Sequence, residues 1–157
     1  MHIPIKVDYA VRALVDLSHH TGGRPVHATQ VARRMAMPEP YLNHILHTLS
    51  KNGFTKAMRG PLGGHSLAMK PADIKLSMVM AAFDETETIV GCLENTATCT
   101  LSDSCGQRNI WQTVDEAVNE ILERTTIADL LKPSILLGVD SSQKSIREPQ
   151  RPPRQNK

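Results

Sequence analysis

The sequence predicts a mainly helical fold with one small β-hairpin, arranged as a winged helix-turn-helix followed by a long helix. Three observations lead to this prediction. Apolar residues recur at helical spacing in three segments before residue 53, strand-forming residues then flank a glycine-rich tip, and a long amphipathic segment spans residues 107–124. Three helices followed by a hairpin is the element order of a winged helix-turn-helix, whose third helix enters the major groove of DNA.

The first three helices are each defined by an apolar stripe and by residues that stop a helix. The first begins near Ile5 and ends at TGGRP. The second fits HATQVARRMA, where His27 is a poor N-cap and the basic pair Arg33 and Arg34 should face outward. The third fits PEPYLNHILHTLSKNG and ends at a C-cap formed by Asn52-Gly53. The stripes expected to be buried are Val7, Ala10, Val11, Leu14 and Leu17, then Ala28, Val31, Ala32 and Met35, then Leu42, Ile45, Leu46 and Leu49.

The rest of the chain predicts a hairpin and three more helical segments. In FTKAMRGPLGGHSLAMK, two strand-like runs flank the breaker cluster of residues 60–64. Residues 73–83 then predict a helix, residues 107–124 a long helix, and TTIADLL a last short one. The long helix carries an apolar seam along one face, which requires a partner surface. The seam consists of Ile110, Val114, Ala117 and Ile121.

Charge divides the chain into three parts. Residues 1–72 hold nine Lys and Arg against three Asp and Glu, residues 73–132 hold four against eleven, and residues 133–157 hold five against two. We therefore expect a basic DNA-binding winged helix-turn-helix domain over 1–72, a cysteine loop with the long helix over 73–132, and a disordered basic tail over 133–157. Chance clustering on solvated faces would give a similar pattern. Without an apolar run of about 18 residues, the chain is expected to be cytoplasmic and to have no membrane partner.

The outer face of the third helix and the hairpin tip carry the residues predicted to contact DNA. Glu39 is expected to accept a hydrogen bond from a cytosine amino group. Arg59 would hold phosphate or enter a narrow minor groove, and glycines at the tip would let the backbone approach phosphates. A solvated face would carry similar residues, and a metal on His44 and His47 would need a third ligand that the neighbouring sequence lacks. The full set is Arg33, Glu39, Pro40, Tyr41, Asn43, His44, His47, Arg59, Gly63 and Gly64.

All three cysteines, Cys92, Cys99 and Cys105, lie in the stretch CLENTATCTLSDSC. Their odd number leaves at least one thiol outside any intramolecular disulfide scheme, and thiolates are the preferred ligands of iron–sulfur clusters. The three thiols therefore predict an incomplete ligand set for one cluster. Two alternatives within a DNA-binding regulator use the same thiols, namely a zinc ion or a redox switch without a cluster. An enzyme is not expected, because no histidine adjoins the cysteines and no phosphate-loop motif is present.

Five stretches of the chain resemble the winged-helix iron–sulfur transcription regulators typified by IscR, NsrR and RirA. They are KVDYAVRALVDL, PEPYLNHILHTLSKNGF, RGPLGGHSLAMKPADI, the three-cysteine loop and ERTTIADLL, which together run from about residue 3 to residue 131. The resemblance implies a homodimer in which the long helix is the dimerisation helix. It also implies an iron–sulfur cluster in the cysteine loop and a palindromic operator in double-stranded DNA. The implied function is a transcription regulator, in the main a repressor, that senses nitric oxide, redox state or iron.

The resemblance also bears on the fourth ligand of the cluster. IscR-like members place a histidine three residues after the last cysteine, where this chain has Arg108, and no histidine follows His65. This departure argues against a histidine-ligated [2Fe-2S] cluster and favours a [4Fe-4S] cluster. NsrR-like members use an acidic residue near the N-terminus of the partner subunit, and the matching residue here is Asp8. The same carboxylate would also suit the N-terminal turn of its own helix.

Overall fold

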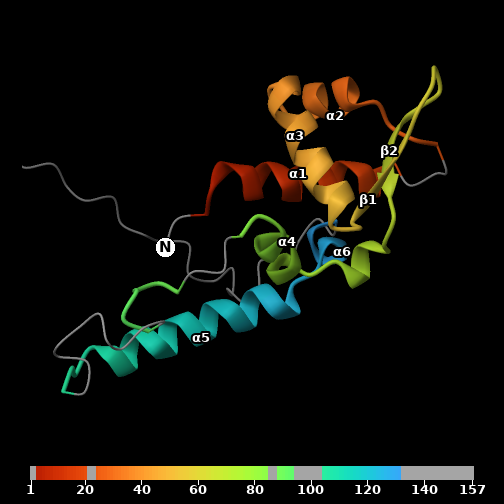
Figure 1. The fold of residues 1–157 in the computed structure, drawn as a ribbon. Helices are drawn as coiled ribbons and strands as arrows, with labels where there is room; N and C mark the ends of the chain where they lie inside the picture. The colour runs from red at the N-terminus through yellow and green to blue at the C-terminus, as the bar shows by residue number, and fades with distance from the viewer. Residues whose placement is uncertain (1–2, 21–23, 85–87, 94–103, 132–157) are drawn as a thin grey trace, which may run out of the picture.

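The computed structural model describes residues 3–20, 24–84, 88–93 and 104–131. Figure 1 shows three helices grouped with a hairpin at one end and a long helix running along the opposite side of the molecule. The cysteine loop between residues 94 and 103 and the predicted tail lie outside the described residues. The elements are α1 (Ile5–His19), α2 (Ala28–Arg34), α3 (Glu39–Lys51), β1 (Thr55–Met58), β2 (Gly64–Leu67), a 3₁₀ turn η1 (Pro71–Asp73), α4 (Leu76–Ala82), α5 (Arg108–Arg124) and α6 (Ile127–Leu130).

The apolar stripes of α1, α2 and α3 pack against one another as the sequence predicts. All four stripe residues of α3 are buried, and so are four of the five predicted in α1, with Val11 half-buried. In α2 only Val31 and Ala32 are buried. His27 stands at the N-cap of α2 without a capping hydrogen bond from its side chain, and Gly53 follows the C-cap of α3 at a φ of +79°.

The hairpin is a two-stranded antiparallel sheet attached to the segment before α2. Its register runs from Thr55 opposite Leu67 to Met58 opposite Gly64. Val26 forms an isolated bridge with His65, and both backbone hydrogen bonds of this bridge measure 2.8 Å. The tip end of the hairpin is therefore fixed to the chain that enters α2, because His65 follows the Met58–Gly64 pair that closes the tip.

The helix predicted over residues 73–83 is shorter than expected. Pro71–Asp73 form the 3₁₀ turn, and α4 begins only at Leu76. The backbone at residues 74–76 pairs instead with residues 125–127. The Leu76 N–H donates to the Thr125 carbonyl, and the Ile127 N–H donates to the Ile74 carbonyl, each at 2.9 Å. This long-range pairing interrupts a periodicity that would otherwise continue the helix.

One hydrophobic core joins residues from both sides of the charge boundary near residue 72. Ile74, Val79, Phe83 and Ile127 belong to the same buried cluster as the stripes of α1 and α3. The ammonium group of Lys6 on α1 also donates to the Phe83 carbonyl at 3.0 Å. Within the described residues, the change in charge does not coincide with a break in the core.

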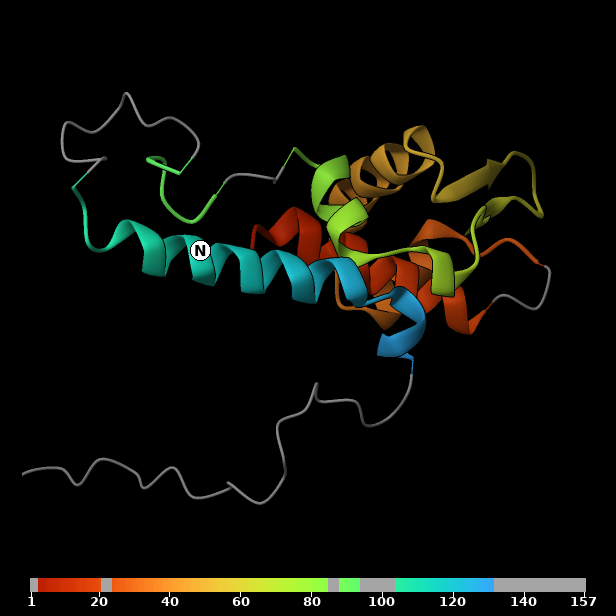
Figure 2. The same cartoon turned by 90° about the horizontal axis from the view of Figure 1, so that it is seen from below.

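The long helix α5 is attached mainly near its C-terminal end. Figures 1 and 2 show its first half extending beyond the other helices. Glu123 accepts hydrogen bonds from Lys75 and Ser77, whereas none of the 17 residues of α5 is buried. The seam residues Ile110, Val114 and Ile121 are 58%, 37% and 39% exposed. Among the described helices, none is both long enough and apolar enough to span a membrane.

Candidate nucleic-acid interface and cysteine segment

The outer face of α3 presents the predicted DNA-contacting side chains together. Its buried stripe fixes the orientation of the helix, so that the opposite face points away from the core. Pro40 lies in the first turn, where its missing N–H interrupts no helical hydrogen bond. The described residues contain no group of three His, Cys, Asp or Glu side chains placed to hold a metal. The exposed members of the predicted set on α3 are Glu39, Pro40, Tyr41, Asn43, His44 and His47.

Glu39 is held in place by a residue that the sequence did not single out. The hydroxyl of Thr29, in α2, donates to Glu39 Oε1 at 2.8 Å. This hydrogen bond links the starts of α2 and α3 and restrains a carboxylate that would otherwise be free to rotate. Thr29 could not be identified from the sequence, because the pairing depends on the turn that brings the two helices together.

Tyr41 combines exposure with a packing role. Its ring lies edge-on to the ring of Tyr9, with centroids 5.7 Å apart and planes at 75°. The Arg12 guanidinium carbon lies 5.7 Å from the centroid of Tyr9. Tyr41 therefore helps to join α3 to α1, and its contact with DNA stays a prediction.

The expectation that both arginines of α2 face outward is wrong for Arg34. Its Nε and Nη2 atoms each donate to the Asp16 carboxylate at 2.7 Å, and Asp16 is 1% exposed within α1. A buried carboxylate requires a charged partner, which explains why Arg34 turns toward α1. The hydrogen bond raises the pKa of Arg34. The sequence signal for this pairing was a carboxylate, Asp16, among the apolar residues of the first helix. Arg33 is exposed as predicted.

The glycines at the hairpin tip are explained by packing within the hairpin. A Cβ atom on Gly63 would collide with the carbonyl oxygens of Met58 and Gly60, and one on Gly64 would collide with the Val26 carbonyl. Gly64 also has a φ of +143°. These steric constraints account for glycine at both positions. The close approach of the hairpin backbone to DNA phosphates stays a prediction. Arg59 is exposed beside them.

Two further side chains of the hairpin were not predicted as functional. Leu62, at the tip, is 88% exposed, more than any other large apolar side chain that the structure describes. His65, opposite Ala57 near the tip, has a buried Nδ1 atom without a hydrogen-bond partner. Burial lowers the pKa of His65, which favours the neutral ring.

The described ends of the cysteine segment lie beside α5. Cys92 and Cys105 are free thiols and are half-buried, whereas Cys99 is outside the described residues. The Ile89 N–H donates to Asp115 Oδ1 at 3.0 Å, and the Arg108 N–H donates to the Cys105 carbonyl at 3.2 Å. The segment is thus attached to the first half of α5, away from α2, α3 and the hairpin in both views (Figures 1 and 2).

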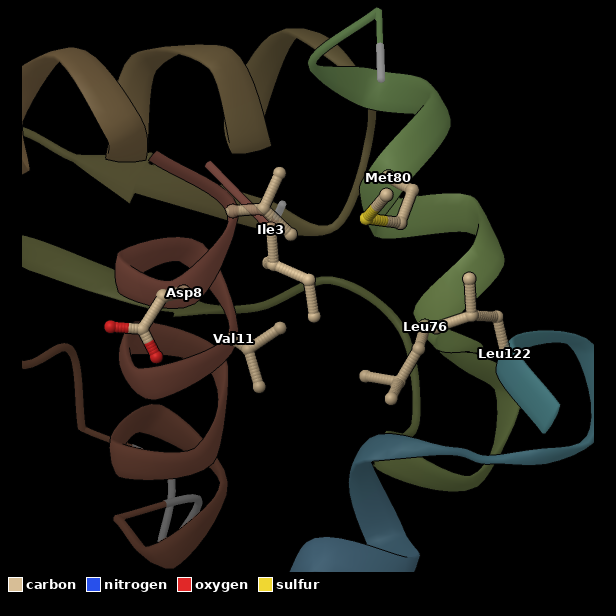
Figure 3. A pocket seen from close by; sticks show the side chains of 7 residues that line it. Ile3, Asp8, Val11, Leu76, Met80 and Leu122 are labelled. Carbon is tan, nitrogen blue, oxygen red and sulfur yellow. The ribbon is translucent and has the colours of Figure 1, made fainter. Parts of the chain in front are cut away.

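Asp8 lies in the first turn of α1. It forms an ion pair with Arg12 at 2.8 Å and is 39% exposed. It borders a cavity of about 170 Å³ whose other walls are apolar. Figure 3 shows its carboxylate pointing away from that apolar lining. The apolar walls are Ile3, Val7, Val11, Leu76, Met80 and Leu122.

The chemistry of these donors fits an iron–sulfur cluster. Cysteine thiolates are the usual ligands of such clusters, and the two described thiols are free and reachable from solvent. Arg108 also has a buried Nε atom with no partner, and that donor suits an anionic group.

Comparison with known proteins gives concordant matches. Residues 3–133 match the Rrf2 family model, described as an iron-dependent transcriptional regulator. The chain is 31% identical over 136 residues to the protein rrf2 of Nitratidesulfovibrio vulgaris, covering 87% of this chain and 91% of that protein. IscR of T. potens matches with a TM-score of 0.66 and 30% identity, covering 83% of this chain and 86% of the other.

A second solved structure broadens the comparison. CymR of B. subtilis, described as the global cysteine regulator, matches with a TM-score of 0.71 and 25% identity over 83% of this chain and 96% of the other. The predicted fold class, a winged helix-turn-helix with a two-stranded hairpin, is confirmed by these structures. The matched family consists of transcription regulators, so the expectation of a protein that is not an enzyme agrees with it.

Proposed function

The chain belongs to the Rrf2 family of iron-dependent transcriptional regulators, and from that premise we propose an iron–sulfur-dependent repressor that acts in the cytoplasm. It would bind a palindromic operator as a homodimer. Cys92, Cys99 and Cys105 would hold a [4Fe-4S] cluster. The observation that carries the proposal is the pair of free, half-buried thiols, of which Cys105 lies in the turn that leads into α5 and the unpartnered donor of Arg108.

The DNA-facing surface would consist of α3 and the hairpin. The exposed face of α3 would lie in the major groove, where Asn43, His44 and His47 meet base edges or phosphates. Glu39, restrained by Thr29, would accept from a cytosine amino group. Arg33 and Arg59 would bind phosphate on either side, with Arg59 also able to enter the minor groove. Residues 1–72 would therefore act as the DNA-binding domain even though their core continues into α4 and α6.

The exposed seam of α5 supports the dimer. Four apolar residues on one face of a helix without a buried position are expected to pack against a partner helix. A symmetric pair of α5 helices would place two copies of α3 on one side of the dimer, as a palindromic operator requires. Residues 73–132 would then serve for cluster binding and dimerisation.

Asp8 of the partner subunit is the proposed fourth ligand. Cys105 lies in the turn before α5, and the segment before Cys92 is attached to the first half of that helix, which we expect to be the half available to a second chain. When bound, the cluster would supply an iron with an oxygen ligand, a position that is open to nitric oxide or oxygen. Because α1 also packs against α2, α3 and β2, a ligand bond at Asp8 would act on the helix that supports the DNA-binding surface.

Anaerobic purification of the full chain tests the proposal. Wild-type protein should be brown and contain about four iron atoms and four sulfides per chain. Cys99→Ala and Cys105→Ala should be colourless with unchanged helical content, because neither thiol is needed for the core. Asp8→Ala should lose its visible absorbance faster than wild type, whereas Asp73→Ala, which removes another exposed carboxylate, should not. Operator affinity would be measured on duplexes selected from random sequence, before and after nitric oxide.

The outcomes separate the proposal from its main alternative. Wild-type protein that stays colourless after incubation with iron and sulfide would contradict cluster binding. If the operator affinity of that colourless protein changed with thiol oxidation, a cysteine redox switch without a cluster would be established instead. Equal affinity with and without the cluster would contradict regulation by the cluster. Selection of no duplex at all would contradict sequence-specific DNA binding.

A further inference from the structure

Arg108 has a hydrogen-bonding donor that the described protein groups leave unsatisfied. It is the first residue of α5, and its Nε atom is buried without a partner. A guanidinium stays charged at every physiological pH, so this donor cannot be neutralised by losing a proton. Leaving a buried, charged donor without an acceptor is unfavourable. The arrangement therefore indicates a missing acceptor.

The position of Arg108 on its helix points to an anion as that acceptor. The N-terminus of a helix carries a partial positive charge, so a cation is unfavourable there and an anion is favourable. The first turn of α5 contains no acidic residue, and the Gln107 side chain makes no capping hydrogen bond. Among the described residues, neither the N-cap of α5 nor the Nε atom of Arg108 has a side-chain acceptor, and one anion would satisfy both.

The local geometry places Arg108 against the cysteine segment. Its N–H donates to the Cys105 carbonyl at 3.2 Å, which makes Cys105 part of the turn that precedes α5. Side chains on a helix lean toward its N-terminus, so the Arg108 side chain extends back over this turn. The start of the cysteine segment is attached to the same half of α5 through Ile89 and Asp115.

We propose that Arg108 is a positioning residue that holds an anionic iron–sulfur cluster at the start of α5 by donating hydrogen bonds to its sulfur atoms. The inference rests on the proposed cluster. A cluster bound by three thiolates and one carboxylate is negatively charged overall, and hydrogen bonds to its sulfurs stabilise the reduced, more negative form. The position that would hold a histidine ligand in IscR-like proteins would here hold a charged donor.

Substitutions of Arg108 test this role in the full chain purified without oxygen. Arg108→Gln should lower the reduction potential of the cluster, measured by spectroelectrochemistry, and shorten the half-life of its visible absorbance in the presence of an iron chelator several-fold. Arg108→Lys should give an intermediate effect, because lysine keeps the charge but not the planar set of donors. Arg124→Gln is the matched control, since it removes an exposed arginine from the opposite end of α5.

The melting temperature of the protein without its cluster is a second measurement. If Arg108 served only to stabilise the fold, Arg108→Gln would lower this temperature. In that form Arg108→Gln should leave the melting temperature unchanged or raise it, because it removes an unsatisfied donor. A loss of stability in the cluster-free form equal to that in the loaded form would overturn the inference, as would a potential and half-life like those of wild type. If wild-type protein held no cluster, the proposed function would fail and the inference with it.

Discussion

The buried carboxylate of Asp16 determines how the second helix lies against the first. It accepts two hydrogen bonds from Arg34, and the backbone carbonyl of the same residue lies 2.7 Å from the Nδ1 atom of His20. The pair is local to the helix-turn-helix but lies outside the face that would meet DNA. In the proposed complex it would contribute to DNA binding by fixing the two helices, and the exposed Arg33 next to it would contact phosphate.

Arg34→Ala should destabilise the fold strongly. The substitution leaves Asp16 buried without its partner, which costs on the order of 3 kcal/mol of unfolding free energy. Arg33→Ala, the matched control, should change stability by less than about 0.5 kcal/mol. Urea denaturation of the three proteins measures this difference. The double variant Asp16→Leu with Arg34→Leu should recover most of the lost unfolding free energy. If Arg34→Ala alone were as stable as wild type, the ion pair between Asp16 and Arg34 would have no structural role.

His65 should make the fold less stable in mild acid. Burial lowers its pKa in the folded state, so between the ordinary value of about 6.5 and that lower value the unfolded chain binds a proton that the folded chain does not. Unfolding free energy therefore falls as the pH falls through this range. His65→Gln should reduce the drop in melting temperature between about pH 7.5 and pH 5.5 relative to wild type. The exposed His47→Gln should leave the drop unchanged, and an equal drop in all three proteins would refute the assignment.

At the scale of elements, the local sequence pattern was enough to predict those helices and strands that are defined by their own periodicity. The stripes of α1 and α3, the hairpin and the extent of α5 follow from the sequence because each depends on neighbours along the chain. The start of α4 and the direction of Arg34 could not be found in this way. Both depend on partners distant in sequence, Thr125–Ile127 in one case and Asp16 in the other.

The seam of α5 should control the oligomeric state. Val114→Asp places a charge at the middle of the exposed apolar face, so it should dissociate the proposed dimer without unfolding a chain in which Val114 is not buried. Asn109→Asp adds the same charge away from the seam and should not. Light scattering after size exclusion should give twice the 17.3 kDa chain mass for wild type and the control. A variant that remains dimeric would exclude this seam as the interface.

At the scale of the whole molecule, basic and acidic residues are separated along the chain. The basic front residues surround α2, α3 and the hairpin, and the acidic ones follow in α5 and the segment before it. This separation would orient the molecule toward DNA before contact is made. The candidate site was predicted from residue types and a resemblance. Its arrangement required the fold, because only the structure shows that Asp8 borders a cavity lined by Leu122 of α5 whereas Cys105 precedes Arg108 at the other end of that helix.

The attachment of α5 at one end has a consequence for local stability. Near Arg124, unwinding the helix would break the pairing of residues 74–76 with residues 125–127 and expose the fully buried Ile127. Near Arg108, unwinding would break only hydrogen bonds close to the surface. The free energy of local opening should therefore rise along the helix from Arg108 to Arg124. In the proposed regulator, rearrangement around the cysteines would then proceed while the core of α1, α2 and α3 stays folded.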